Sequence, residues 1–120
     1  DLTIVTWGAI VQKAVEASRN TGKSVEIIDI RTLNPLDIDT ILNSIKKTNR
    51  VIVAHEDHLT GGFGSEIAAQ ISDAGFEYLD APVKRVASKD VHVAYSPNLE
   101  NEILVQTSWI EKEIEEILTY

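Results

Sequence analysis

Cysteine is absent from the 120 residues, and lysine and arginine are scarce. Without cysteine the chain has no disulfide framework, no thiolate nucleophile and no cysteine-based zinc site. Eleven basic residues against nineteen acidic ones leave a formal net charge of -8, which argues against a nucleic-acid partner and favours a basic one. No apolar run approaches the ~20 residues that a helix needs to span a bilayer, so we expect no membrane partner.

What remains is the composition of an ordinary globular domain. Hydrophobic residues make up 43% of the chain and charged residues 25%, without the signature of disorder or of a coiled coil. A chain of this length can bury a core of its own, so we expect one domain that spans residues 1–120 and folds alone. Because the chain begins at Asp1 rather than Met, we also expect it to be a fragment of a longer polypeptide.

Strand-like and helix-like patterns alternate along the chain. Extended runs, mostly rich in β-branched residues, occupy residues 2–7, 24–30, 50–54, 76–79 and 83–87. Apolar residues at helical spacing occupy residues 9–20, 38–47, 63–74 and 109–118. Parallel neighbouring strands need a crossover, and the crossover helix covers a face of the sheet. The pattern therefore predicts an α/β fold: a three-layer α/β/α sandwich around a mostly parallel five-stranded sheet.

Capping residues define the expected helix ends. Gly22 stands where a left-handed C-terminal cap belongs, and Gly75 marks the end of the third helix. Asp37 is a natural N-cap for the second helix, because its carboxylate can accept a bond from an unpaired backbone N–H. Ser108 and Glu111 have the spacing of a capping box, which predicts that the last helix begins near Trp109.

Residues 55–66 hold the densest group of chemically capable side chains, with the sequence HEDHLTGGFGSE. The segment follows the end of the third strand, and ligands of open α/β sheets favour that edge. His55 and His58, with Glu56 and Asp57, offer nitrogen and oxygen ligands to a metal. Zincin helices, however, place two histidines four apart rather than three. The alternative is structural: one histidine anchors the segment by a hydrogen bond and the other is exposed.

Two other interpretations of the segment have weaker support. Glycines that open a helix after a strand can present N–H groups to a phosphate, but the order Gly61-Gly62-Phe63-Gly64 does not match G-x-G-x-x-G. Glycines that let a helix pack closely against the sheet explain the same order. Ser65 lies outside a G-x-S-x-G elbow, and Glu66 is a favourable acid for a first helical turn. His92 lies in a loop expected to be polar, where an exposed ring is the default.

Four separated motifs give the chain a family resemblance. They are VTWGA at residues 5–9, IDIRTLNPLD at 28–37, VIVAHEDHLTGGFGSEI at 51–67 and YLDAPVKRV at 78–86. Together they resemble the C-terminal domain of the beta subunit of thiamine-diphosphate-dependent 2-oxo acid dehydrogenases, a transketolase C-terminal domain, over nearly the whole chain. LTGGFGSEI looks closer to branched-chain and fused alpha-beta versions than to several pyruvate versions.

The resemblance implies a domain without catalytic residues of its own. In the family, thiamine diphosphate and Mg lie between two other domains, so no catalytic, cofactor-binding or metal-binding role is carried onto His55, His58 or Glu66. The implied role is assembly: contact with an alpha subunit, with a second beta subunit, and with the small basic peripheral subunit-binding domain of the dihydrolipoyl acyltransferase. The matching contact positions are Asp80 and the carboxylate of Tyr120. The implied compartment is the bacterial cytoplasm rather than the mitochondrial matrix.

Two other interpretations stay open. One is a small flavodoxin-like metal-binding enzyme whose site combines His55, His58 and Glu66. The other is the same domain in another thiamine enzyme, such as a transketolase or a deoxyxylulose-phosphate synthase. Those enzymes need basic residues for a substrate phosphate, whereas residues 55–58 offer acids.

Overall fold

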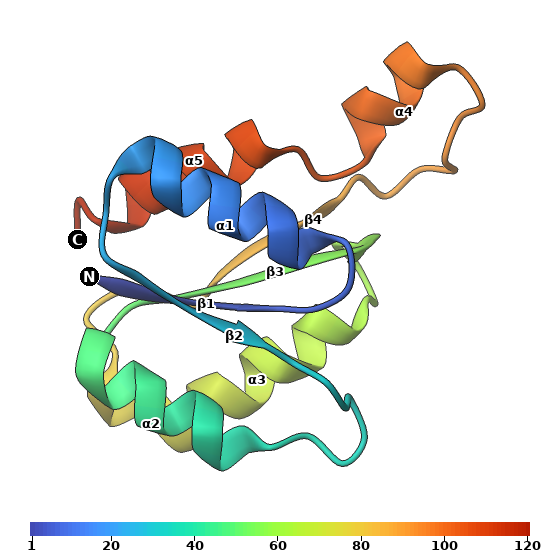
Figure 1. The fold of residues 1–120 in the computed structure, drawn as a ribbon. Helices are drawn as coiled ribbons and strands as arrows, with labels where there is room; N and C mark the ends of the chain where they lie inside the picture. The colour runs from blue at the N-terminus through green and yellow to red at the C-terminus, as the bar shows by residue number, and fades with distance from the viewer.

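The structure, a computed structural model, describes residues 1–120 and is built on a four-stranded parallel sheet (Figure 1). The strands are β1 (Leu2–Thr6), β2 (Val25–Asp29), β3 (Val51–His58) and β4 (Lys84–Ser88). Their order across the sheet is β2-β1-β3-β4, and every neighbouring pair is parallel. Each crossover between parallel neighbours carries a helix, as the alternating sequence pattern predicts.

Helices cover both faces of the sheet, which gives three layers (Figure 1). The elements outside the sheet are α1 (Ile10–Thr21), α2 (Ile38–Thr48), α3 (Phe63–Gly75), the 3-10 helix η1 (Phe76–Tyr78), α4 (Pro97–Ile103) and α5 (Thr107–Ile117). α1 and α5 lie side by side on one face, and α2 and α3 cover the other. No helix is long and apolar enough to cross a membrane.

The two faces of the sheet bury two separate apolar clusters. Side chains of a strand alternate between faces, so Ile52 and Ala54 of β3 pack with α1 and α5, whereas Val51 and Val53 pack with α2 and α3. All five residues of β1 are buried, because this strand lies between β2 and β3 and is covered on both faces. This arrangement confirms the predicted α/β/α sandwich.

Three of the predicted helix ends are confirmed and one is wrong: α3 ends at Gly75, as expected. Gly22 has φ +64° and caps α1, while Asp37 accepts a bond from the Thr40 N–H at the start of α2. The Ser108–Glu111 capping box is absent, since α5 begins at Thr107 after an N-cap at Gln106 that makes no side-chain bond. α5 starts earlier than predicted, between Val105 and Ile110, and both of these side chains are buried in the core.

The sheet has four strands rather than the predicted five. Residues 76–79 were expected to be extended, but Phe76–Tyr78 form a turn of 3-10 helix at the end of α3. Phe76 is 78% exposed, so the apolar residue that produced the strand-like pattern is not in the core. α4 was not expected at all, because none of its residues is buried and no apolar periodicity marks it.

Candidate functional site

The segment from His55 to His58 is part of a strand, not a loop. β3 continues through His58, with an irregularity in its pairing to β4 between Ala54 and His58. His55 is 0% exposed, and its ring stacks on Trp7, which follows β1, with centroids 5.3 Å apart and planes 3° from parallel. The strand thus carries one histidine into the interior and ends on exposed residues.

The glycines of the segment make room for this histidine. A Cβ atom built on Gly64 would collide with the His55 ring, and one built on Gly62 would collide with the His58 carbonyl oxygen and lie 2.9 Å from His55 Cε1. Both glycines are buried at the start of α3, so the helix approaches β3 with the imidazole filling the gap. The space that a phosphate would need over these glycines is occupied by the chain itself, and the packing interpretation is confirmed.

Burial keeps His55 uncharged. Neither ring nitrogen has a hydrogen-bond partner in the protein, and desolvation lowers the pKa of the ring below its ordinary value. The expectation that one histidine anchors the segment by a hydrogen bond is therefore wrong for His55, which acts through stacking and packing. A ring closed off from solvent and from other polar groups is not positioned for proton transfer.

The other polar residues of the segment point elsewhere. His58 is exposed, and its Nε2 donates to the backbone oxygen of Val91 over 3.1 Å. Glu66, on the surface of α3, accepts a bond from Gln70 over 2.8 Å. No three His, Cys, Asp or Glu side chains in the chain are grouped to hold a metal ion, so the structure does not assemble the alternative site of His55, His58 and Glu66.

Ser65 has a cation rather than a base for a neighbour. The Arg85 guanidinium donates to its Oγ over 2.6 Å and to the Leu59 carbonyl oxygen over 2.8 Å. A positive donor cannot take a proton from the hydroxyl, so this contact gives Ser65 no activation as a nucleophile. The bond instead ties β4 to the start of α3.

The second pair of candidate residues lies at the opposite end of the sheet. The N–H of Asp80 donates to the Asn49 carbonyl oxygen over 2.8 Å, which places Asp80 at the amino end of β3. The Tyr120 ring lies 5.9 Å from Nζ of Lys84, the first residue of β4. Asp80 and Tyr120, both exposed, therefore lie at the amino ends of the neighbouring strands β3 and β4, and we call this region the amino-end surface.

The amino-end surface contains a fixed ion pair. Lys84 Nζ is 3.4 Å from Glu113 Oε1 of α5, and the charge of Glu113 raises the pKa of the lysine. Lys84 is thus already engaged inside the domain. Asp80 has no cationic partner within the chain, so its carboxylate is free for an external one.

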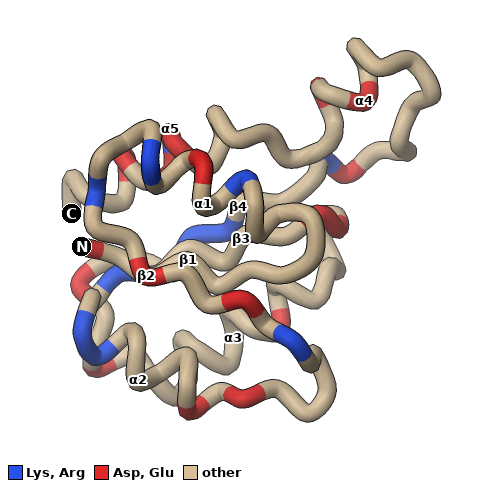
Figure 2. The backbone as a smooth tube through the Cα atoms, viewed as in Figure 1, with Lys and Arg blue, Asp and Glu red and all other residues tan.

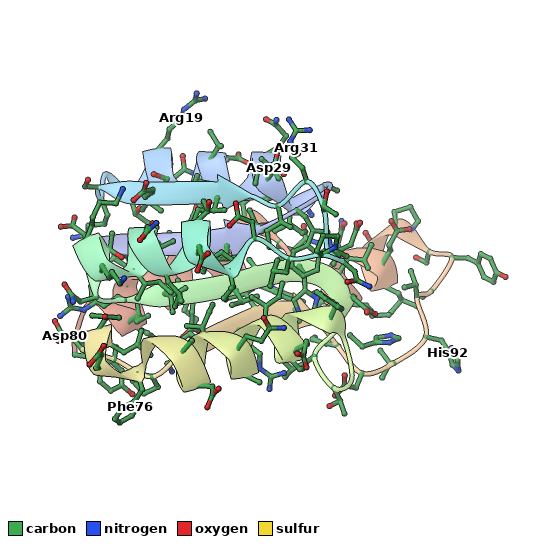
Figure 3. The ribbon with its side chains drawn as sticks, turned by 90° about the horizontal axis from the view of Figure 1, so that it is seen from below. Arg19, Asp29, Arg31, Phe76, Asp80 and His92 are labelled. Carbon is green, nitrogen blue, oxygen red and sulfur yellow. The ribbon has the colours of Figure 1, made fainter.

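An apolar groove of about 670 Å³ adjoins Asp80. Its walls are α3 and the segment that links η1 to β4. It is lined by Ala68, Ala69, Ser72, Phe76, Leu79, Asp80, Ala81, Pro82 and Val83. Figure 3 shows Phe76 and Asp80 at the same end of the molecule, away from His92. Sequence reasoning missed Phe76, whose signal was a large aromatic residue directly after the glycine that ends a helix.

The comparison with known families agrees with this fold over most of the chain. Residues 1–110 match the family model described as "Transketolase, C-terminal domain". The chain belongs to the transketolase C-terminal domain family. The resemblance inferred from the four sequence motifs is confirmed.

Similar transketolase C-terminal domains occur in 2-oxo acid dehydrogenase beta subunits. The chain is 43% identical over 110 residues to the mitochondrial pyruvate dehydrogenase E1 component subunit beta of Dictyostelium discoideum, covering 89% of this chain and 31% of that protein. It is 38% identical over 122 residues to the corresponding subunit of Rickettsia felis, covering 99% and 37%. The mitochondrial 2-oxoisovalerate dehydrogenase subunit beta of D. discoideum is 43% identical over 94 residues, covering 75% of this chain and 25% of that subunit.

A solved structure shows the same domain. A protein titled "Split gene transketolase, inactive beta4 tetramer" superposes with a TM-score of 0.82 at 27% identity, covering 99% of this chain and 38% of that one. The chain spans about a third of the length of the first relatives it matches. The partner-binding roles of Asp80 and Tyr120 remain predictions.

Proposed function

We propose that this transketolase C-terminal domain is the assembly domain of the beta subunit of a 2-oxo acid dehydrogenase E1 component. The complete enzyme would decarboxylate a 2-oxo acid of the pyruvate or branched-chain type on thiamine diphosphate, with Mg, and pass the acyl group to lipoamide. This domain holds neither cofactor and supplies no catalytic group. The observation that carries the proposal is the exposed carboxylate of Asp80 at the edge of an open apolar groove, at the same end of the sheet as Tyr120.

The amino-end surface fits a small basic module. Asp80 offers an exposed carboxylate at the edge of the groove, and an arginine of the partner can bind a carboxylate through two parallel hydrogen bonds. Phe76 supplies an exposed aromatic surface of the kind enriched at interfaces. The net charge of -8 steers a basic partner toward the chain. These features support docking of the peripheral subunit-binding domain of the dihydrolipoyl acyltransferase.

Further partners follow from the beta-subunit character of the relatives. We assign the domain an alpha subunit, or an alpha portion, and a second beta subunit as neighbours in the enzyme. The Rickettsia felis relative, which aligns over 99% of the chain, is bacterial, and this favours the bacterial cytoplasm.

The docking proposal is tested by reversing the charge of Asp80 in the assembled E1 component. Asp80→Lys places an ammonium where the partner's basic residue would bind, and we expect its affinity for the peripheral subunit-binding domain to fall on the order of tenfold or more. Surface plasmon resonance with the immobilised binding domain measures the change. The matched control, Asp39→Lys, makes the same charge change at an exposed position of α2, at the end of the sheet opposite Asp80.

The two variants separate a local contact from general steering. Equal weakening by both would mean that only net charge matters, and Asp80 would lose its assigned role. An Asp80→Lys enzyme that binds with wild-type affinity would remove the amino-end surface from the docking site. Overall activity in the reconstituted complex should fall with docking, while decarboxylation with an artificial electron acceptor should stay at the wild-type rate.

A further inference from the structure

β4 is an edge strand, so one side of its backbone has no neighbouring strand (Figure 1). The Ser88 carbonyl oxygen accepts from the N–H of Leu59, just beyond β3, so the backbone of Ser88 faces β3. Successive residues of a strand direct their N–H and C=O groups to opposite sides. Arg85 and Ala87 therefore direct theirs away from the sheet, and no loop or turn of the chain bonds to them.

The chain itself occupies the first position along this open edge. The N–H of Lys89, the next outward group in the alternation, donates to the Ile103 carbonyl oxygen over 3.0 Å. Beyond Ile103 the chain enters α5 and does not pair with β4. The outward groups of Ala87 and Arg85 follow in line with this one bond. An extended segment placed beside them continues the sheet by β-strand addition.

A groove of about 460 Å³ runs along the open edge. It is lined by residues of β4 and α5 together with Leu59. Among the lining residues of β4, Val86 packs in the core beneath α5, whereas Arg85 reaches Ser65 of α3 on the other face of the sheet. A groove lined from both faces lies across the edge between them, which is the place of an added strand.

The charges beside the groove favour an acidic occupant, although the chain as a whole is acidic. β4 begins with Lys84 and Arg85, drawn in blue in Figure 2. Arg85 donates only to uncharged oxygen atoms and has no carboxylate within ion-pair distance. Glu113 is compensated by Lys84 over 3.4 Å. Lys112 lies 3.5 Å from Glu116, but both side chains are largely exposed and such a pair is weak.

The two sides of the groove differ in chemistry. Arg85 lies on the α3 side, and the ring of Trp109, partly buried against the core, lies on the α5 side. The side chains of an added strand alternate between these sides. We propose that the open edge of β4 binds an extended peptide segment of another protein, in which acidic residues face Arg85 and alternate with apolar residues that face Trp109. This site is separate from the amino-end surface and does not depend on docking there.

A fluorescein-labelled peptide in which glutamate alternates with valine tests the site in the full-length protein that contains this domain, in its assembled form. The matched control peptide carries lysine in place of each glutamate. We expect saturable binding of the acidic peptide, measured by fluorescence anisotropy, and binding of the lysine peptide that is weaker on the order of tenfold or more. Absence of binding by the acidic peptide, or equal binding of the two peptides, overturns the inference.

A change in the backbone of β4 shows whether strand pairing holds the peptide. Ala87→Pro removes one outward N–H and leaves the bonds between β3 and β4 in place, and edge strands tolerate proline at such a position. The matched control, Ala87→Ser, keeps the N–H. We expect the proline variant to bind the acidic peptide more weakly on the order of tenfold, and the serine variant to bind it with wild-type affinity. Wild-type affinity in the proline variant contradicts pairing at this edge.

Methylation of the peptide gives the same test without a change in the protein, so it decides the question if Ala87→Pro does not fold. One peptide is methylated on its glutamate nitrogens and another on its valine nitrogens, which removes the donors from one strand edge or the other. Pairing through a single edge predicts that only one of them loses binding, and retained binding by both overturns the inference. Analytical ultracentrifugation tests the other occupant: self-association that Ala87→Pro abolishes would assign the edge to a second copy and overturn the peptide assignment.

Discussion

At the residue scale, His55 is the side chain whose role differs most from its appearance in the sequence. Two histidines and two acids in four residues resemble a reactive cluster, but the structure directs His55 into the interior against Trp7 and leaves His58 outside. The imidazole packs as an aromatic ring. A positive charge on it would be unfavourable, because neither ring nitrogen has a hydrogen-bond partner. Its burial makes the stability of the domain depend on pH.

We expect the free energy of unfolding to fall as the pH is lowered through the ordinary histidine range. Burial lowers the pKa of His55 from its usual 6.5, although the charge of Asp57 opposes the shift. Below about pH 6.5 the unfolded chain therefore binds a proton that the folded chain rejects, so stability is present above that pH and declines below it. Urea unfolding at about pH 8 and about pH 5 measures the slope.

Two comparisons assign that slope to His55. His55→Gln should flatten it, whereas His92→Gln removes an exposed ring, leaves the buried one in place and should keep the contribution of His55. Hydrogen bonds from Thr40 and Thr60 lower the pKa of Asp37 and Asp90, but these carboxylates act at lower pH, because their ordinary value is 3.8. A His55→Gln protein with the wild-type slope would contradict the assignment.

At the element scale, the contact between β3 and α3 depends on what two glycines leave out. Gly64 lies in the first turn of α3, where it weakens the helix, and it is buried against the His55 ring. Gly64 allows the backbone of α3 to approach β3 more closely than any side chain at this position would permit. The end of β3, Gly62, Gly64 and α3 therefore pack together as one unit.

Gly64→Ala should therefore destabilise the protein even though alanine is the better helix former. Helix propensity alone favours alanine by about 1 kcal/mol, but overpacking against a buried ring costs roughly 1–3 kcal/mol, and its Cβ would collide with His55. We expect a net loss in the free energy of unfolding, measured by urea denaturation.

A double variant tests whether His55 is the cause. In a His55→Ala background the colliding atoms are gone, so Gly64→Ala should cost less there than in the wild type and could become favourable. The difference between the two costs is the coupling energy of the pair. Equal costs in both backgrounds would show that the glycine serves something other than the approach to His55.

At the scale of the whole molecule, exposed apolar features lie at the two ends of the sheet. The amino-end surface carries Asp80, Tyr120 and the apolar groove, while residues 91–99, beyond the carboxyl end of β4, expose Val91, Val93, Tyr95 and Leu99. No group of side chains in the domain is arranged to hold a metal.

We expect residues 1–120 alone to bind no thiamine diphosphate. A diphosphate needs basic side chains or free backbone N–H groups. The space beside the glycines at the start of α3 is occupied by the His55 ring. Isothermal titration calorimetry with thiamine diphosphate and Mg should show no uptake by the isolated chain, whereas the assembled E1 component should bind it. Micromolar uptake by the isolated chain would contradict the assembly role.

The sequence by itself determined the layered α/β architecture, because strand and helix periodicities are local patterns that survive in one dimension. It also determined the second helix start at Asp37, where one carboxylate reaches one nearby N–H. The four motifs by themselves place the chain in its family. A strand-like apolar pattern at Phe76 and a capping-box spacing at Ser108 were misleading, since neither says whether the residue faces the core.

Only the tertiary structure decided which of the candidate residues are buried, which are exposed and which residues surround them. Whether His55 binds, reacts or packs depends on Trp7 and Gly64, which approach it from other segments. Asp80 and Tyr120, forty residues apart in the sequence, lie at the same end of the sheet only because the fold brings the amino ends of β3 and β4 side by side. The exposed apolar side chains of residues 91–99 became visible only in the fold, because exposure is a property of the folded surface. The type of each residue determines which chemistry its side chain can perform. The packing of segments that are distant in the sequence determines which side chains are exposed and which residues they contact.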